Sequence, residues 1–137
     1  MIAALFEGVT WLGVLLGMIG AMAWGSLYYS PVMFMKAWIA AMGKTPEELG
    51  NPVKALINAA VMNLIAGLGI NIVMVMHGVT SIAGAAANAV FIWVVFCLST
   101  ELLHDRYNGM SVRLSLINAG NTLGAYVVMG VIIQLLR

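Results

Sequence analysis

The sequence is poor in charge and contains only one cysteine. Charged residues make up 8% of the 137 residues, and Cys97 lies within an apolar run without a partner. A disulfide within the chain is therefore excluded, and a small buried apolar side chain is the expected role of this thiol. The formal net charge of +1 provides none of the clustered basic surface that nucleic-acid binding requires.

Apolar residues take the place of the missing charge. They make up 63% of the chain, and the mean hydropathy is +1.02. Soluble domains are closer to half apolar and a quarter charged, so the composition predicts a membrane protein. The amino-terminal segment resembles a signal peptide at Ala21-Met22-Ala23, but it contains Glu7 and lacks Lys and Arg. We therefore expect a retained membrane helix there.

Four apolar segments are long enough to cross a bilayer. They cover residues 7–28, 53–76, 80–103 and 112–136. At ~1.5 Å per helical residue, about twenty residues cross a hydrocarbon layer of ~30 Å, and only helices suit isolated runs of this length. The sequence predicts an all-α membrane protein, a four-transmembrane-helix bundle that forms a single domain over residues 1–137.

All three prolines directly follow a residue that can cap a helix. The pairs are Ser30-Pro31, Thr45-Pro46 and Asn51-Pro52. Such pairs are typical of helix starts, because the polar side chain accepts from free amides and proline lacks an amide. We therefore expect a short interfacial helix over residues 31–42, which contains the interface aromatic Trp38. Glu48 adds a capping box after Thr45.

The basic residues are distributed unevenly between the two ends of the predicted bundle. One side has Lys36, Lys44, Lys54, Arg106 and Arg113, and the other has only Arg137. Because Lys and Arg concentrate in cytoplasmic loops, this asymmetry predicts cytoplasmic loops after the first and third spans. Both termini then lie outside the cytoplasm.

Small residues recur at every fourth position of the first span. These are Gly13, Gly17, Ala21 and Gly25, which share one face of a helix. Small side chains allow a second backbone to approach closely, which is how helices associate in lipid. The stripe predicts a helix-packing seam, and it motivates the hypothesis of a homo-oligomer or a subunit of a larger membrane complex, in contact with membrane lipids.

Six asparagines fall inside the predicted spans: Asn58, Asn63, Asn71, Asn88, Asn118 and Asn121. Asn63, Asn88 and Asn121 are close to the midpoints of their segments, so we expect them at one depth. They would either form interhelical hydrogen bonds, worth ~0.6 kcal/mol each, or line a path for a small solute or water. The absence of a charged residue at that depth argues against ion-coupled transport by this chain alone.

Ionisable and aromatic residues gather at the predicted cytoplasmic face. The candidate cluster comprises Tyr28, Tyr29, Lys54, Glu101, His104, Asp105 and Arg113. Lys54 and Arg113 could bind a lipid headgroup, and Glu101 with His104 could bind a metal. The chain has one Glu-x-x-His pair where di-iron bundles need two with further glutamates. Ion pairing at a helix end is the simpler explanation.

Other chemistry has little support in the sequence. Met74, Met76 and His77 offer donors that suit copper(I), but methionine commonly fills apolar cores and a histidine before Gly78 is typical of a helix end. We find no nucleophile triad, phosphate-binding glycine loop or haem ligand pair. The sequence therefore predicts no enzyme activity and no cofactor.

The run Tyr-Tyr-Ser-Pro-x-x-Phe-x-x-x-Trp, from Tyr28 to Trp38, resembles a bacterial family of small four-span membrane proteins with a Trp-Tyr-Ser-Pro signature. The Leu-Ile-Asn-Ala-Gly stretch from Leu116 to Gly120 and the glycine-rich first span are similar too. The family has no assigned function. The resemblance implies a four-helix fold in a bacterial inner membrane, and Tyr28 replaces the tryptophan of the signature.

Three functions remain open at this point. The first is a non-catalytic bundle that acts through self-association or as an accessory subunit. The second is an oligomeric carrier or channel for a small solute, lined by the membrane asparagines. The third is a lipid-headgroup or metal site at the cytoplasmic face.

Overall fold

The computed structural model describes residues 3–137, which form helices and no strand over that range. The elements in chain order are η1 (Ala3–Phe6), α1 (Trp11–Tyr28), α2 (Met35–Met42), η2 (Pro46–Leu49), α3 (Val53–Met76), α4 (Ile82–Ile92), the π-helical segment η3 (Trp93–Leu98), α5 (Ser99–Tyr107) and α6 (Val112–Leu135).

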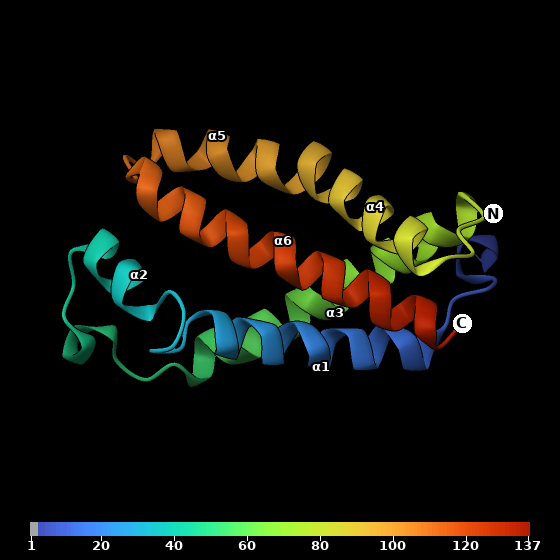
Figure 1. The fold of residues 1–137 in the computed structure, drawn as a ribbon, viewed down its shortest axis with the longest axis horizontal. Helices are drawn as coiled ribbons and strands as arrows, with labels where there is room; N and C mark the ends of the chain where they lie inside the picture. Colours follow the sequence, from blue (N-terminus) through green and yellow to red (C-terminus); the bar gives the residue numbers. More distant parts are fainter. Residues whose placement is uncertain (1–2) are drawn as a thin grey trace.

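Four helices have the length and apolarity of membrane spans. They are α1, α3, α6 and the continuous helix Ile82–Tyr107, which comprises α4, η3 and α5. The predicted class, an all-α protein with four membrane-spanning helices, is confirmed. Figure 1 shows both termini at one end of the bundle, and α2 with η2 at the other. These ends are called the terminal end and the α2 end below.

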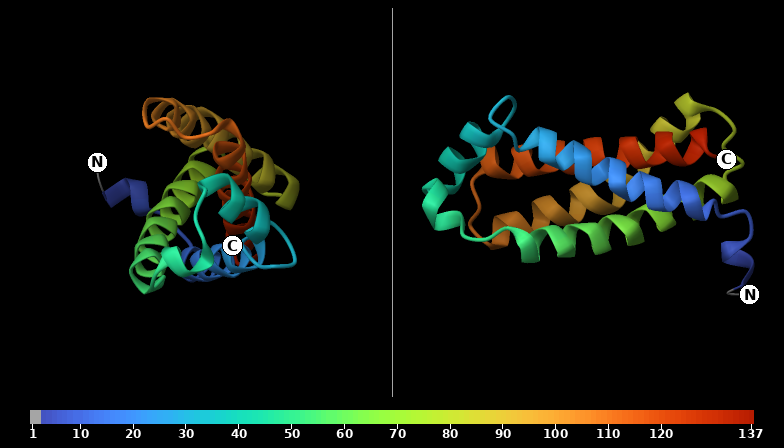
Figure 2. Two further views of the ribbon diagram at one scale, coloured as in Figure 1. Left: turned by 90° about the vertical axis from the view of Figure 1, so that its left-hand side faces the viewer. Right: turned by 90° about the horizontal axis from the view of Figure 1, so that it is seen from below.

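Helix α6 is the centre of the packing. It lies against α1 on one side and against α4 on the other, while α3 packs on α1 (Figures 1 and 2). Its buried residues extend from Leu114 to Ile133, nearly its whole length. The other three spans are therefore arranged around a helix that belongs to the last segment of the chain.

The tightly packed core occupies the terminal half of the bundle. Ile70, Met74, Met129 and Ile133 are almost completely buried there. All the buried residues of α3 lie between Gly67 and Met74, and none lies in its first half. Helices α1 and α3 are thus in close contact toward the terminal end and leave space between them toward the α2 end.

The small-residue stripe of α1 faces α6 of the same chain. A Cβ atom added at Gly13 would lie 3.2 Å from the Cα atom of Ile133, and one added at Gly17 would lie 3.5 Å from the Cα atom of Met129. Ala21 is also buried. Gly13, Gly17 and Ala21 therefore pack against α6 of the same chain, and a homo-oligomer stays a prediction.

Two helices begin later than predicted. The segment expected as a helix over residues 31–42 becomes helical only at Met35, because Phe34 and Met35 donate backbone hydrogen bonds to the carbonyls of Tyr28 and Ser30 and close a turn. The first span, expected from residue 7, begins at Trp11. Gly8 precedes it with a φ of 79°, a left-handed conformation that no helix contains.

The other two capping pairs, Thr45-Pro46 and Asn51-Pro52, precede helices as predicted. Thr45 and Glu48 form the capping box, in which the Thr45 amide donates to the Glu48 carboxylate at 2.6 Å. Only the short η2 follows it. Asn51 accepts from the Val53 amide at 2.9 Å, so its side chain satisfies a free donor at the start of α3.

The third span extends further than predicted. The sequence suggested an end near residue 103, but the helix continues to Tyr107 and is closed by Gly109 with a φ of 68°. The polar residues that resembled a loop form its last turn instead. Glu101 therefore lies about 9 Å inside the helix end, at ~1.5 Å per residue. The fourth span ends at Leu135, one residue before the expected end.

Candidate functional site

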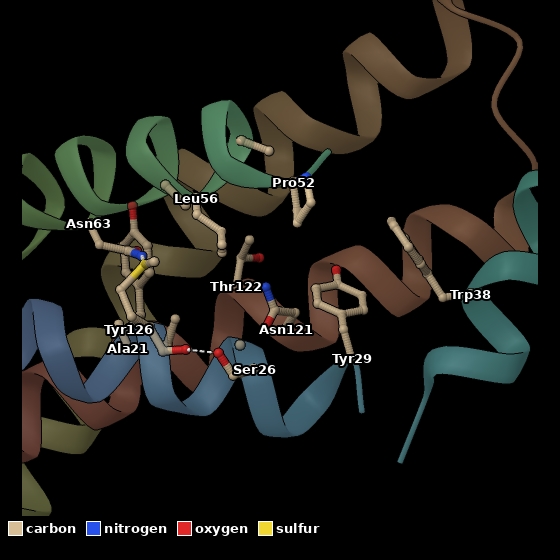
Figure 3. A pocket seen from close by; sticks show the side chains of 15 residues that line it. Ala21, Ser26, Tyr29, Trp38, Pro52, Leu56, Asn63, Asn121, Thr122 and Tyr126 are labelled. Atoms are coloured by element: carbon tan, nitrogen blue, oxygen red, sulfur yellow. Dashed lines mark hydrogen bonds between the residues drawn. The ribbon is translucent and has the colours of Figure 1, made fainter. Parts of the chain in front are cut away.

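A cavity of about 430 Å³ lies between α1, α3 and α6 in the half of the bundle toward the α2 end (Figure 3). Its lining consists of Ala21, Met22, Gly25, Ser26, Tyr29, Trp38, Pro52, Ala55, Leu56, Ala59, Asn63, Asn121, Thr122, Ala125 and Tyr126. These residues come from segments far apart in the sequence. The cavity therefore forms only when α1, α2, α3 and α6 pack together.

Small residues on the facing helices leave this space open. Ala21 and Gly25 come from α1, Ala55 and Ala59 from α3, and Ala125 from α6. The wide separation of α1 and α3 at this end enlarges the space further. The absence of buried residues in the first half of α3 reflects this separation. The cavity is thus a product of helix divergence and of side-chain size.

Several polar groups in the lining have unused hydrogen-bonding capacity. The amide nitrogen of Asn63 donates only to the sulfur of Met22, at 3.6 Å, and a thioether is a weak acceptor. The side-chain oxygen of Asn121 is buried and has no partner among residues 3–137. That oxygen is turned toward Gly25 of α1, so the Asn63 amide is the group that favours an occupant with polar atoms.

An aromatic wall, Tyr29 and Trp38, lines the side of the cavity nearest the α2 end. The two ring centroids are 5.0 Å apart. Both side chains donate to the side-chain oxygen of Asn118, Tyr29 at 3.1 Å and Trp38 at 3.2 Å. Burial, together with the neighbouring Tyr28 and Glu101, raises the pKa of Tyr29 to about 12. The phenol therefore keeps its proton, and the wall keeps its hydrogen bonds, over the physiological pH range.

A second layer of polar residues supports α6 from the third span. In η3 the indole of Trp93 donates to the Thr122 hydroxyl at 2.9 Å, and the Cys97 thiol donates to the Tyr126 hydroxyl at 2.7 Å. The carboxylate of Glu101 lies 3.3 Å from the same Thr122 hydroxyl. Because π-helical turns occur frequently at functional sites, this layer is part of the candidate site.

The predicted cytoplasmic-face cluster is divided by the fold. Tyr29 lines the cavity, and Glu101 lies behind the lining, 3.3 Å from the Thr122 hydroxyl. Tyr28 is buried against Gly120, with its ring stacked on that of Phe34. Asp105 is buried, whereas Lys54, His104 and Arg113 are exposed.

The structure offers no metal centre in the part of the chain that it describes. No three His, Cys, Asp or Glu side chains of residues 3–137 come together as metal ligands. Met74 is completely buried in the apolar core. The ring of His77 is hydrogen-bonded to Asn88 at 3.0 Å. The donors considered for copper(I) therefore have other roles.

The three mid-membrane asparagines do not share one depth, which corrects the prediction. Asn63 and Asn121 line the cavity. Asn88 lies near the terminal end, beside His77, because the third span is longer than expected and its midpoint lies nearer η3. Only two of the three asparagines therefore belong to the site.

Sequence analysis missed Trp93, Cys97 and Tyr126. The signal that could have revealed Tyr126 is its spacing of four residues from Thr122, which extends the polar face of α6. The roles of Trp93 and Cys97 depend on the wider turn of η3, for which an apolar run gives no pattern.

The helices and the cavity define a small integral membrane protein with four spans and a partly polar pocket within the bundle. Residues 12–134 match the family described as protein of unknown function (DUF1761), and the chain belongs to this family. No curated protein and no solved structure matches the chain.

Proposed function

We propose that this protein binds a small amphipathic solute in the cavity between α1, α3 and α6. The observation that supports the proposal is the Asn63 amide, which among residues 3–137 donates only to the sulfur of Met22, in the wall of a cavity that also has an aromatic side. A polar group of the solute would pair with Asn121 and Asn63, and its apolar part would contact Leu56 and the alanines.

The dimensions of the cavity suit such an occupant. A volume of about 430 Å³ falls within the ~300–1,000 Å³ of typical small-molecule sites, which combine an apolar lining with a few convergent polar groups. Most of the lining consists of alanine and other apolar or aromatic side chains. Asn63, Asn121 and Thr122 provide the polar groups that would orient the solute.

A binding site fits the structure better than an open channel through one chain. The terminal half of the bundle is filled by the buried side chains of Ile70, Met74, Met129 and Ile133. The cavity therefore does not continue through the chain, and a solute would enter and leave at the α2 end. The Lys and Arg distribution supports a cytoplasmic location for that end, in a bacterial inner membrane with both termini outside.

The test uses a cavity-filling substitution. Ala59→Phe places a ring in the cavity, and Ala87→Phe makes the same change at an exposed position of α4. Purified protein in detergent is screened by thermal stabilisation against small amphipathic aromatics, alcohols and amines. We expect the compounds that stabilise the wild type to stabilise Ala59→Phe to a different extent. Ala87→Phe should be stabilised to the same extent as the wild type. Equal responses of Ala59→Phe and wild type to every stabilising compound would refute the proposal.

A further inference from the structure

We infer that the solute bound in this cavity is an organic cation with an ammonium group, recognised by the aromatic wall and by the carboxylate of Glu101. The inference rests on the proposed function, since it names the chemical class of the ligand for that same cavity. It follows from the charges around the cavity rather than from its size.

Glu101 is an acid without a basic partner among residues 3–137. It lies inside the third span and is partly buried. Its hydrogen-bond donor among residues 3–137 is the Thr122 hydroxyl, and the charged group that acts on it is Asp105, another carboxylate. Asp105 is itself 8% exposed, with one oxygen unpartnered. Because uncompensated charge within a membrane is costly, these acids favour a bound cation or a proton.

The carboxylate is connected to the cavity through one side chain. Thr122 lines the cavity and also contacts Glu101. Glu101 is close enough to Tyr29 and Tyr126, both lining residues, to act on them electrostatically. A rotation of the Thr122 hydroxyl toward the Ala119 carbonyl, its other acceptor at 3.0 Å, frees the carboxylate. A cation in the cavity could then interact with Glu101.

The remaining lining distinguishes a cation from an anion. No Lys or Arg is among the residues that line the cavity, so an anionic ligand would find no counter-charge. The electron-rich faces of Tyr29 and Trp38 attract an ammonium group. Both features favour positive charge in the ligand.

A proton and the cation compete for the same carboxylate. The titratable groups that face Glu101 are Tyr29 at the end of α1, Tyr126 on α6 and Asp105 on its own span. The helices α2 and α3 present no charged side chain to it within residues 3–137. The cation should bind the deprotonated carboxylate, so affinity should rise with pH and decline in acid.

The experiment compares two probes of the same shape. Choline and 3,3-dimethyl-1-butanol differ in having a charged nitrogen or a neutral carbon at the centre of the trimethyl group. Their binding to the full chain in detergent is measured by equilibrium dialysis, at mildly alkaline and mildly acidic pH. We expect wild type to prefer choline by about tenfold or more at alkaline pH, and to lose this preference in acid.

The variants identify the residues responsible. Glu101→Gln keeps the shape of the side chain, and we expect it to prefer choline less than the wild type does at alkaline pH, with no change of this preference between the two pH values. Glu7→Gln, an acid outside the spans, serves as the control and should behave as wild type. Trp38→Leu should weaken choline more than the alcohol.

Three results would overturn the inference. If the alcohol binds wild type as tightly as choline, the inference fails while the proposed function stands. If neither probe binds and Ala59→Phe changes no response to the wider panel, both fail. A preference for choline that persists unchanged in Glu101→Gln would also contradict the role of this carboxylate.

Discussion

The contact between α1 and α6 predicts opposite outcomes for leucine at two glycines. Gly17 faces the backbone of α6, where an added Cβ would lie 3.5 Å from both the Cα atom and the carbonyl oxygen of Met129. Gly69 lies on α3 with no atom within 4 Å of the same added group. Gly17→Leu should destabilise the bundle, and Gly69→Leu should not.

The size of the effect follows from the space at each site. At 3.5 Å an alanine at position 17 makes ordinary van der Waals contact, but the further carbons of leucine have no room against a backbone. Overpacking of this kind costs about 1–3 kcal/mol, which lowers the ratio of folded to unfolded protein about 5- to 150-fold. In lipid no hydrophobic effect holds α1 and α6 together, so the loss of close packing between them is not offset.

The assay is unfolding of the purified protein by increasing SDS in mixed micelles, followed by tryptophan fluorescence. Because the seam lies within one chain, the midpoint shift of Gly17→Leu should be the same at low and high protein concentration. Gly17→Ala should resemble wild type. An equal shift for Gly17→Leu and Gly69→Leu, or a shift that grows on dilution, would refute intrachain packing of this stripe.

Three further predictions concern the α2 end and its neighbours. Asn118→Leu removes the acceptor shared by Tyr29 and Trp38; leaving these donors unpaired should cost about 1–3 kcal/mol in the same SDS titration. Gly124→Ala places a methyl group on the indole of Trp24, so we expect a loss of about 1–3 kcal/mol and a changed fluorescence spectrum. Since the folded pKa of Tyr29 is about 12, above its ordinary value of 10.0, its contribution to stability should be complete below the ordinary value and be lost as pH rises toward the folded one. The tyrosinate absorbance of wild type minus that of Tyr29→Phe measures this titration, and a difference that appears near the ordinary value would contradict the burial of this phenol.

The class of fold could be predicted because the bilayer imposes length and apolarity on each span, and four segments met both conditions. The ends were less accurate. The last turn of the third span contains His104 and Asp105, whose polarity resembles that of a loop, whereas the helix stops only where Gly109 adopts a positive φ. Polarity marks the edge of the lipid, and the end of the hydrogen-bonded helix lies beyond it.

The cavity could be predicted only in part. Asn63 and Asn121 were recognisable as amides that must face the interior of the bundle, and both line it. Their convergence with Trp38 depends on the angle between α1 and α3 and on the turn before α2, which are set by tertiary packing. The same extension of the third span that displaced Asn88 lengthened the helix beyond Glu101, which the predicted span of residues 80–103 already contained.

The π-helical segment has a consequence for the alignment of the third span. Trp93, Cys97, Glu101 and Asp105 recur at intervals of four, and in a regular α-helix each such step overshoots a full turn by about 40°. Wider turns in η3 absorb part of this drift, so side chains a dozen residues apart can share one direction. A regular α-helix over the same residues would turn Glu101 away from the direction of Trp93 by about 80°, two steps of about 40°. The wider turns of η3 therefore keep the acid directed at α6 together with Trp93.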